Sequence, residues 1–167
     1  MDFQKELIAE FGRETDKTRK MLDAIPADAD FSFQPHPKSM TLGVLADHLA
    51  GIAGPWAVGG LTTDKLALPA DHKPEHKAIE SKAALLAQYD KQVAETKAVL
   101  AKFDPAKWED NWKFLVGEHA IFDSTKFELF REGVINHLVH HRAQLGVYLR
   151  LMDKPLPGTY GPSADGM

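Results

Sequence analysis

The sequence predicts an all-α fold, a four-helix bundle with long connections, and three observations support this. Four segments of about twenty or more residues repeat apolar side chains at helical spacing. Proline or glycine follows each of them, and no segment repeats another. The 167 residues are few enough for one core, so we expect a single domain over residues 1–167. Because two of the three connections are long, an up-down-up-down order is not assumed.

The first two predicted helices flank a polar loop rich in proline and aspartate. The first runs over residues 3–25 and stops at Pro26, because proline lacks an amide hydrogen and clashes with the preceding turn. The second begins after Thr41, whose hydroxyl suits an N-cap. We expect it to end at Gly59-Gly60, and residues 62–77 to form a solvent-facing loop.

A short β-hairpin is predicted between the third and the last helix. The third helix covers residues 81–103 and ends before Asp104-Pro105. Apolar runs at 112–116 and 120–122, separated by Gly117-Glu118, then suggest two paired strands. The last helix covers residues 125–152, because Thr125 and Glu128 have capping-box spacing and prolines follow Met152.

Three histidines carry the strongest functional signal. His137 and His141 are four residues apart, and at about 100° per residue both fall within about 60° of the apolar face of the last helix. Their Cβ atoms then lie about 5–6 Å apart, so both imidazoles can bind one ion. His48 interrupts the apolar face of the second helix between Leu45 and Ile52. The sequence therefore predicts one divalent metal ion per chain, held by His48, His137 and His141.

A structural interpretation of these residues stays open. A single inward histidine such as His48 is more often a hydrogen-bonded core residue than a ligand. Arg142, next to His141, either binds an anionic group or pairs with an acidic neighbour. The other histidines are expected to be surface residues or, for His140 at about 120° from the apolar centre, surplus to the site. They are His36, His72, His76, His119 and His140.

The composition restricts the classes of function. The net charge of −4 and the lack of a basic stripe argue against nucleic acid as a partner. The chain has no cysteine, which excludes disulfides, thiolate ligands and a cysteine nucleophile, and suits a cytoplasmic location. The most apolar stretch, residues 42–61, contains Asp47, His48, Pro55 and several glycines, so no membrane span is expected.

Three motifs resemble those of a known family. Ser39-Met40-Thr41-Leu42 leads into the helix that carries His48. The pattern His137-x-x-x-His141-Arg142-x-Gln144-Leu145 follows in the last helix, and the tail reads Pro157-Gly158-Thr159-Tyr160-Gly161-Pro162-Ser163-Ala164-Asp165. In these motifs the chain resembles the DinB family, within the superfamily of DinB-like metalloenzymes and thiol-dependent transferases.

The resemblance implies a four-helix bundle in which a histidine triad binds nickel, zinc or a similar ion. It places the ligands at His48, His137 and His141. It also implies a homodimer, which would cover the apolar surface of the last helix that includes Leu129 and Val147. Some members of the superfamily transfer or isomerise small-molecule substrates with the help of low-molecular-weight thiols.

Three functions are compatible with the sequence. The first is a metal-dependent transferase that uses a small thiol, which the cation would deprotonate. The second is a metal-activated hydrolase, although the inward faces offer no obvious carboxylate as general base. The third is a non-enzymatic, metal-stabilised protein of the stress response. No catalytic or cofactor-binding residue beyond the three histidines is assigned, and imidazole suits zinc, nickel, copper and iron alike.

Overall fold

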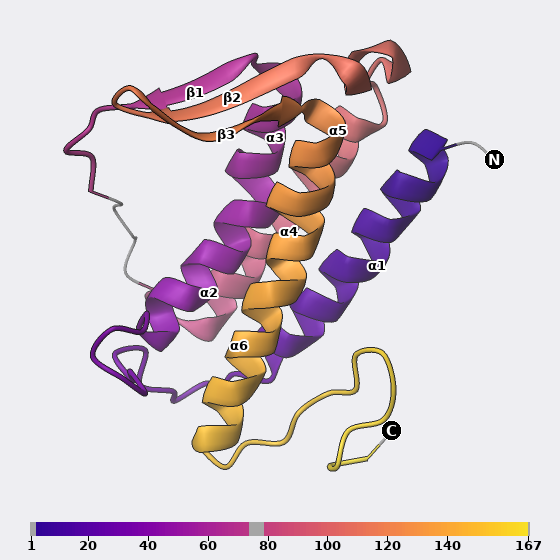
Figure 1. Ribbon diagram of the computed structural model, residues 1–167. Coiled ribbons are helices and arrows are strands. Elements are labelled where there is room, and N and C mark those ends of the chain that lie inside the picture. Colours follow the sequence, from indigo (N-terminus) through magenta and orange to yellow (C-terminus); the bar gives the residue numbers. More distant parts are fainter. Residues whose placement is uncertain (1–2, 74–78, 167) are drawn as a thin grey trace.

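Four helical runs, the short 3-10 helix η2 (Pro105–Glu109) and a small sheet are the regular elements in the described part of the chain, residues 3–73 and 79–166 of a computed structural model (Figure 1). The first run is α1 (Phe3–Asp23) and the third is α4 (Lys82–Leu100). The second joins α2 (Leu42–Gly51), the π-helical segment η1 (Ile52–Trp56) and α3 (Ala57–Thr62). The fourth joins α5 (Lys126–Glu128), the π-helical segment η3 (Leu129–Asn136) and α6 (His137–Leu151). The four predicted helices are therefore confirmed.

The helices enclose one apolar core. Both α1 and α2 pack against α4 and α6, so each helix contacts two neighbours around the core. Phe11, Leu22, Leu49, Leu100 and Leu145 are fully buried there. The predicted N-cap is present, since the Thr41 hydroxyl accepts the amide hydrogen of Val44 at 3.2 Å. This packing places one face of α2 directly against α6.

The predicted hairpin is part of a mixed three-stranded sheet, so the all-α prediction was incomplete. Strands β2 (Asn111–Val116) and β3 (His119–Thr125) pair antiparallel, and β1 (Lys65–Leu68) pairs parallel with β2. The sheet lies across one end of the helices (Figure 1). The segment 62–77, predicted to be a loop, thus contains a strand. Its four residues are too few for a periodic pattern, and its partner is distant in the sequence.

The sequence predicted that the second helical run ends at Gly59-Gly60, but the run continues to Thr62. A Cβ atom on Gly60 would lie 2.4 Å from Cδ2 of Leu129. The glycine therefore serves close packing between the second and fourth runs, not termination. Leu129 is only 2% exposed as a result, so the prediction that it faces a second copy was wrong.

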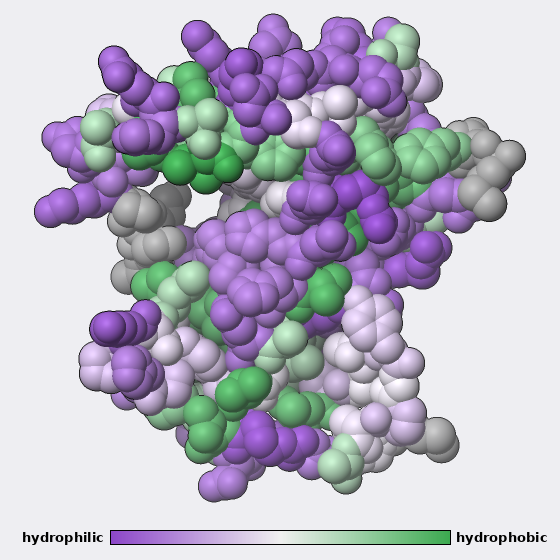
Figure 2. Space-filling model, viewed as in Figure 1, coloured by the Kyte–Doolittle hydropathy of each residue, from purple (hydrophilic) through white to green (hydrophobic). Residues whose placement is uncertain are grey.

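The lower end of α6 keeps an apolar surface. Val147 and Leu151, one turn apart, are each 58% exposed. Figure 2 shows hydrophobic side chains gathered around this end of the helix, and a second hydrophobic group below the sheet. No helix in residues 3–73 and 79–166 has the length and apolar character needed to cross a bilayer.

Two buried side chains, Lys126 of α5 (Lys126–Glu128) and Trp112 of β2, bind the C-terminal end of α3. The Lys126 side chain is almost fully buried, and its Nζ donates to the carbonyl oxygen of Thr63 at 2.7 Å and contacts that of Leu61 at 3.4 Å. A positive charge stabilises the C-terminal end of α3, where carbonyl groups lack helical partners. Trp112 of β2 is 1% exposed and donates its indole N–H to the Thr63 hydroxyl.

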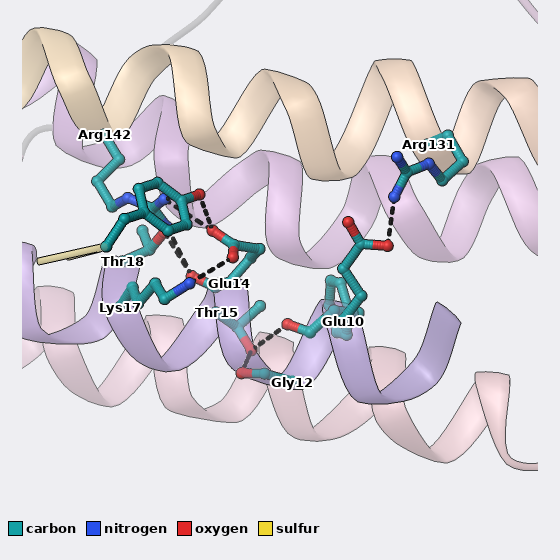
Figure 3. A network of polar contacts seen from close by, with 10 residues as sticks. Glu10, Gly12, Glu14, Thr15, Lys17, Thr18, Arg131 and Arg142 are labelled. Carbon is teal, nitrogen blue, oxygen red and sulfur yellow. Dashed lines mark hydrogen bonds and ion pairs between the residues drawn. The ribbon is translucent and has the colours of Figure 1, made fainter. Parts of the chain in front are cut away.

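A buried ion pair fixes α6 against α1. Arg142 Nη2 donates to Glu14 Oε2 at 2.7 Å, and Nη1 donates to the Glu14 carbonyl oxygen at 3.0 Å. Both side chains are less than a tenth exposed. Figure 3 shows Arg142 reaching from α6 to Glu14 and Thr18 of α1, with Lys17 on the other carboxylate oxygen. Of the two roles left open for Arg142, the structure shows the ion pair with an acidic residue, and that residue lies 128 positions away in the sequence.

The same carboxylate binds the C-terminal tail. The Tyr160 hydroxyl donates to Glu14 Oε2 at 2.6 Å, and Lys17 Nζ lies 3.9 Å from the centre of the Tyr160 ring. Farther along, Arg150 and Asp165 form an ion pair at 2.7 Å that holds the end of the tail. The Pro157–Asp165 motif therefore folds back onto α1 and α6.

Stability should depend on pH through Glu14. Burial alone would raise the pKa of Glu14, but hydrogen bonds from Lys17, Tyr160 and Arg142 outweigh it and lower the pKa from 4.5 to about 2. A depressed pKa stabilises the folded state above pH 4.5, and this contribution disappears as the pH falls from about 4.5 to about 2. It amounts to about 3 kcal/mol.

We expect Glu14→Gln to lower the free energy of unfolding at pH 7 by about 3 kcal/mol, because Arg142 stays buried without a counterion. Urea unfolding of the variant and the wild type from pH 7 to pH 2 measures this, and the difference should shrink below pH 4.5. Glu10→Gln is the control: Glu10 pairs with Arg131 at the surface, so its loss should cost less than about 1 kcal/mol. Equal effects of the two substitutions would contradict the prediction.

Candidate metal centre

Three histidines from two helices converge on one point. His48 lies on α2, and His137 and His141 lie on the facing side of α6. The Nε2 atom of His48 is 3.3 Å from Nε2 of His137 and 3.2 Å from Nε2 of His141. The predicted set is thus brought together, with ligand atoms all within 4.8 Å of one another. Among the described residues, no other group of three or more histidines and carboxylates has this arrangement.

The spacing of the nitrogens fits a single ion. Imidazole nitrogens bind zinc at about 2.0–2.1 Å, so two of them at an angle of about 90–110° lie about 2.8–3.4 Å apart. The distances from His48 to His137 and His141 fall in that range. A metal-bound set needs nitrogens that carry lone pairs and are held in orientation by other bonds, and the remaining ring nitrogens of the pair on α6 supply such bonds.

Hydrogen bonds determine which nitrogen of each α6 histidine carries the proton. His137 Nδ1 lies 3.3 Å from the carbonyl oxygen of Gly133, and His141 Nδ1 lies 2.7 Å from Oε1 of Gln144. Because both oxygens only accept, each Nδ1 must donate its hydrogen. In the neutral rings Nε2 is then unprotonated, with its lone pair toward His48. Two of the three converging nitrogens are therefore prepared as ligands.

Burial keeps the two α6 imidazoles neutral. Burial is the main cause that lowers the pKa of His137, against a smaller opposing effect of the Gly133 carbonyl. Burial likewise lowers the pKa of His141 from 6.5 to about 4, although the hydrogen bond to Gln144 raises it. Both rings are thus neutral at pH 7, which is the form that binds a metal.

Contacts outside the triad fix α2 relative to α6. The Tyr148 hydroxyl donates to the carbonyl oxygen of Met40 at 2.8 Å. Tyr148 lies two turns beyond His141 on α6, and Met40 precedes the N-cap of α2, two turns before His48. The bond therefore holds the axial positions of the two helices and keeps His48 level with the pair on α6.

The remaining histidines do not join the centre. His140 is exposed and accepts a hydrogen bond from Gln144 Nε2 at 3.1 Å, as expected for a residue outside the site. His36, His72 and His119 are exposed, in agreement with their predicted surface positions. His76 lies outside the described residues.

Sequence reasoning missed two residues that support the centre, Gln144 directly and Glu14 through Arg142. Gln144 was noticed only as part of a motif, although its position three residues after His141 puts it within reach of that ring. Glu14 was not singled out in the sequence. It continues the inward spacing of Leu7, Phe11 and Thr18, and that pattern could have identified it as buried.

Comparison with known proteins places the chain in a family. A solved DinB-like protein from Bacillus cereus is 23% identical to it, with a TM-score of 0.69 and coverage of 93% of this chain and 97% of the other. A DinB-like protein from Bacillus subtilis is 18% identical, with a TM-score of 0.63 and coverage of 92% and 97%. At these identities the likeness concerns the fold. No curated protein matches significantly. The sequence model of the DinB family matches residues 1–167, and the chain therefore belongs to the DinB family.

Proposed function

We propose that this chain is a metal-dependent transferase that uses a low-molecular-weight thiol to act on a small-molecule substrate. In this proposal His48, His137 and His141 hold one divalent ion, with nickel or zinc the best candidates. The observation that carries the proposal is the convergence of three Nε2 atoms, with no carboxylate from the described residues among them.

Neutral ligands suit this chemistry. A divalent ion held by three imidazoles keeps its full charge and open coordination positions, so it lowers the pKa of a thiol bound there. The chain itself contains no cysteine, and the thiol must come from solution. In the transfer, the thiol loses its proton and a carbon–sulfur bond forms at an electrophilic carbon of the substrate. Either the bond to the leaving group breaks and the leaving group takes its electron pair, or the carbon–carbon π bond breaks and the adjacent carbon takes a proton.

The protein's own residues hold the ligand set in place. Gln144 and the Gly133 carbonyl keep the protons of His141 and His137 on Nδ1. Since both rings are neutral at pH 7, no proton has to leave them before a cation binds.

Hydrolysis by a metal-bound water is the less favoured alternative, because a general base is normally required beside the water. The described carboxylates contribute no member to the histidine cluster. The buried carboxylate, Glu14, is engaged by Arg142, Lys17 and Tyr160. A non-enzymatic metal-handling protein would have the same geometry but no substrate. Activity screening distinguishes this role from the two enzymatic ones.

We expect one divalent ion per chain. His137→Ala or His141→Ala should weaken binding by about a hundredfold or more, since two imidazoles from different helices cannot complete a tight site. His140→Ala is the matched control and should change affinity less than twofold, because His140 contributes no nitrogen to the cluster. Elemental analysis and competition titration with a chromophoric chelator measure both quantities. A similar loss in all three variants would mean that the ligand assignment is wrong.

Thiols should reach the metal. In the cobalt-substituted protein, a thiol that binds the ion adds an intense sulfur-to-metal charge-transfer band, and the band should weaken at low pH as protons compete. The band should be absent in His48→Ala. Transfer of the same thiol to electrophilic test substrates, followed by mass spectrometry, then measures activity. Unchanged spectra with several bacterial low-molecular-weight thiols would reject thiol transfer and favour the non-enzymatic role.

A further inference from the structure

The carbonyl group of Gly133 is diverted from the hydrogen bonding of an α-helix. In an α-helix the amide of His137 would donate to the carbonyl four residues earlier, at Gly133. In the π-helical segment η3, that amide donates to Glu132 and Val134 instead. The Gly133 oxygen accepts two side-chain donors: Trp56 Nε1 at 2.8 Å and His137 Nδ1 at 3.3 Å.

Gly133 allows this arrangement because it has no side chain. A Cβ atom there would lie 3.0 Å from Cδ1 of Leu129 and 3.4 Å from Nε1 of Trp56. Both separations are at or below the contact distance of the atoms involved. Any larger residue would press the indole away from the carbonyl oxygen that it binds.

The Trp56 ring is itself held from two sides. It ends the π-helical segment η1, in which Pro55 has no amide hydrogen to donate. On the sheet side, the ring packs edge-on against Trp112 at 5.5 Å between ring centres and against Phe114 at 5.3 Å. The indole N–H therefore comes from the second helical run and not from the run that carries His137, and aromatic rings of β2 pack against the indole.

We propose that Trp56 is a positioning residue of the metal centre. Its N–H holds the Gly133 carbonyl outside the helical ladder, and the carbonyl fixes the proton of His137 on Nδ1. The Nε2 lone pair of His137 then faces His48 and His141. Without the indole N–H, the carbonyl returns toward the helical amides and His137 loses its Nδ1 partner. This inference rests on the proposed metal site but not on the thiol reaction.

The test compares two tryptophans of the same aromatic cluster. Trp56→Phe removes the N–H that reaches Gly133, whereas Trp112→Phe removes an N–H that reaches only the Thr63 hydroxyl. Nitrogen-15 NMR of the imidazole rings in the metal-free protein reports the tautomer of each histidine. Titration with cobalt against a competing chelator reports affinity.

Trp56→Phe should convert His137 from one Nδ1–H tautomer to a mixture and leave the His141 ring unchanged. Its affinity for cobalt should fall about tenfold, the usual order for the loss of a partner behind a metal ligand. Trp112→Phe should lower thermal stability but keep the tautomer of His137 and change the affinity less than twofold. If Trp56→Phe does not fold, Trp56 is replaced by benzothienylalanine, which exchanges N–H for sulfur in a ring of nearly the same size.

Two results would overturn the proposal. One is an unchanged His137 tautomer and affinity when the indole N–H is removed. The other is an equal loss in the Trp56 and Trp112 variants, which would reduce Trp56 to a packing residue. Neither measurement contains a thiol, so a failure of thiol transfer leaves the outcome unaffected. If the wild type bound no cobalt, the metal site would fail, while the tautomer of His137 would still decide whether Trp56 positions the ring.

Discussion

The buried pair of Arg142 and Glu14 determines how α6 is rotated in the bundle, and the candidate centre depends on that rotation. Consecutive residues of a helix point about 100° apart. With the guanidinium fixed to α1, the preceding residue, His141, is turned toward α2, where His48 lies. A helix held only by apolar contacts tolerates small rotations about its axis. Rotation of α6 would separate Arg142 from Glu14 and leave a buried charge without its counterion, so this helix resists rotation.

Two faces of one helix therefore perform different tasks. The side of α6 toward α1 carries a charge network that also recruits the C-terminal tail through Tyr160. The side toward α2 carries neutral imidazoles. Because the cation Arg142 is neutralised by Glu14, its charge would not oppose a metal ion held by the histidines on the neighbouring face of the helix. The sequence neighbours His141 and Arg142 thus act in separate environments.

Features with a local cause could be predicted from the sequence. The capping box at Thr125 and Glu128 and the N-cap at Thr41 follow from short-range hydrogen bonds, and the spacing of His137 and His141 follows from helix geometry. Features set by distant partners could not. Strand β1 forms only because β2 lies beside it. In the sequence, Gly60 resembles a helix terminator, and only the structure shows that it allows close packing of Leu129.

The π-helical segment in the fourth run could not be predicted from helical periodicity either, because that reasoning assigns the same rotation of about 100° to every residue. Such a segment corresponds to one residue inserted into an α-helix. Its evolutionary consequence is unusual. Each residue of a π-helix turns by less than the about 100° of an α-helix, so the wider segment absorbs the additional residue. Deleting one residue within Leu129–Asn136 would restore a regular helix and turn α6 by much less than 100°. Such a descendant would keep all three histidines near their shared target but would lose the Gly133 carbonyl as the partner of His137. In this lineage, the inserted residue adds a hydrogen-bond acceptor behind a ligand while the ligand itself stays in place.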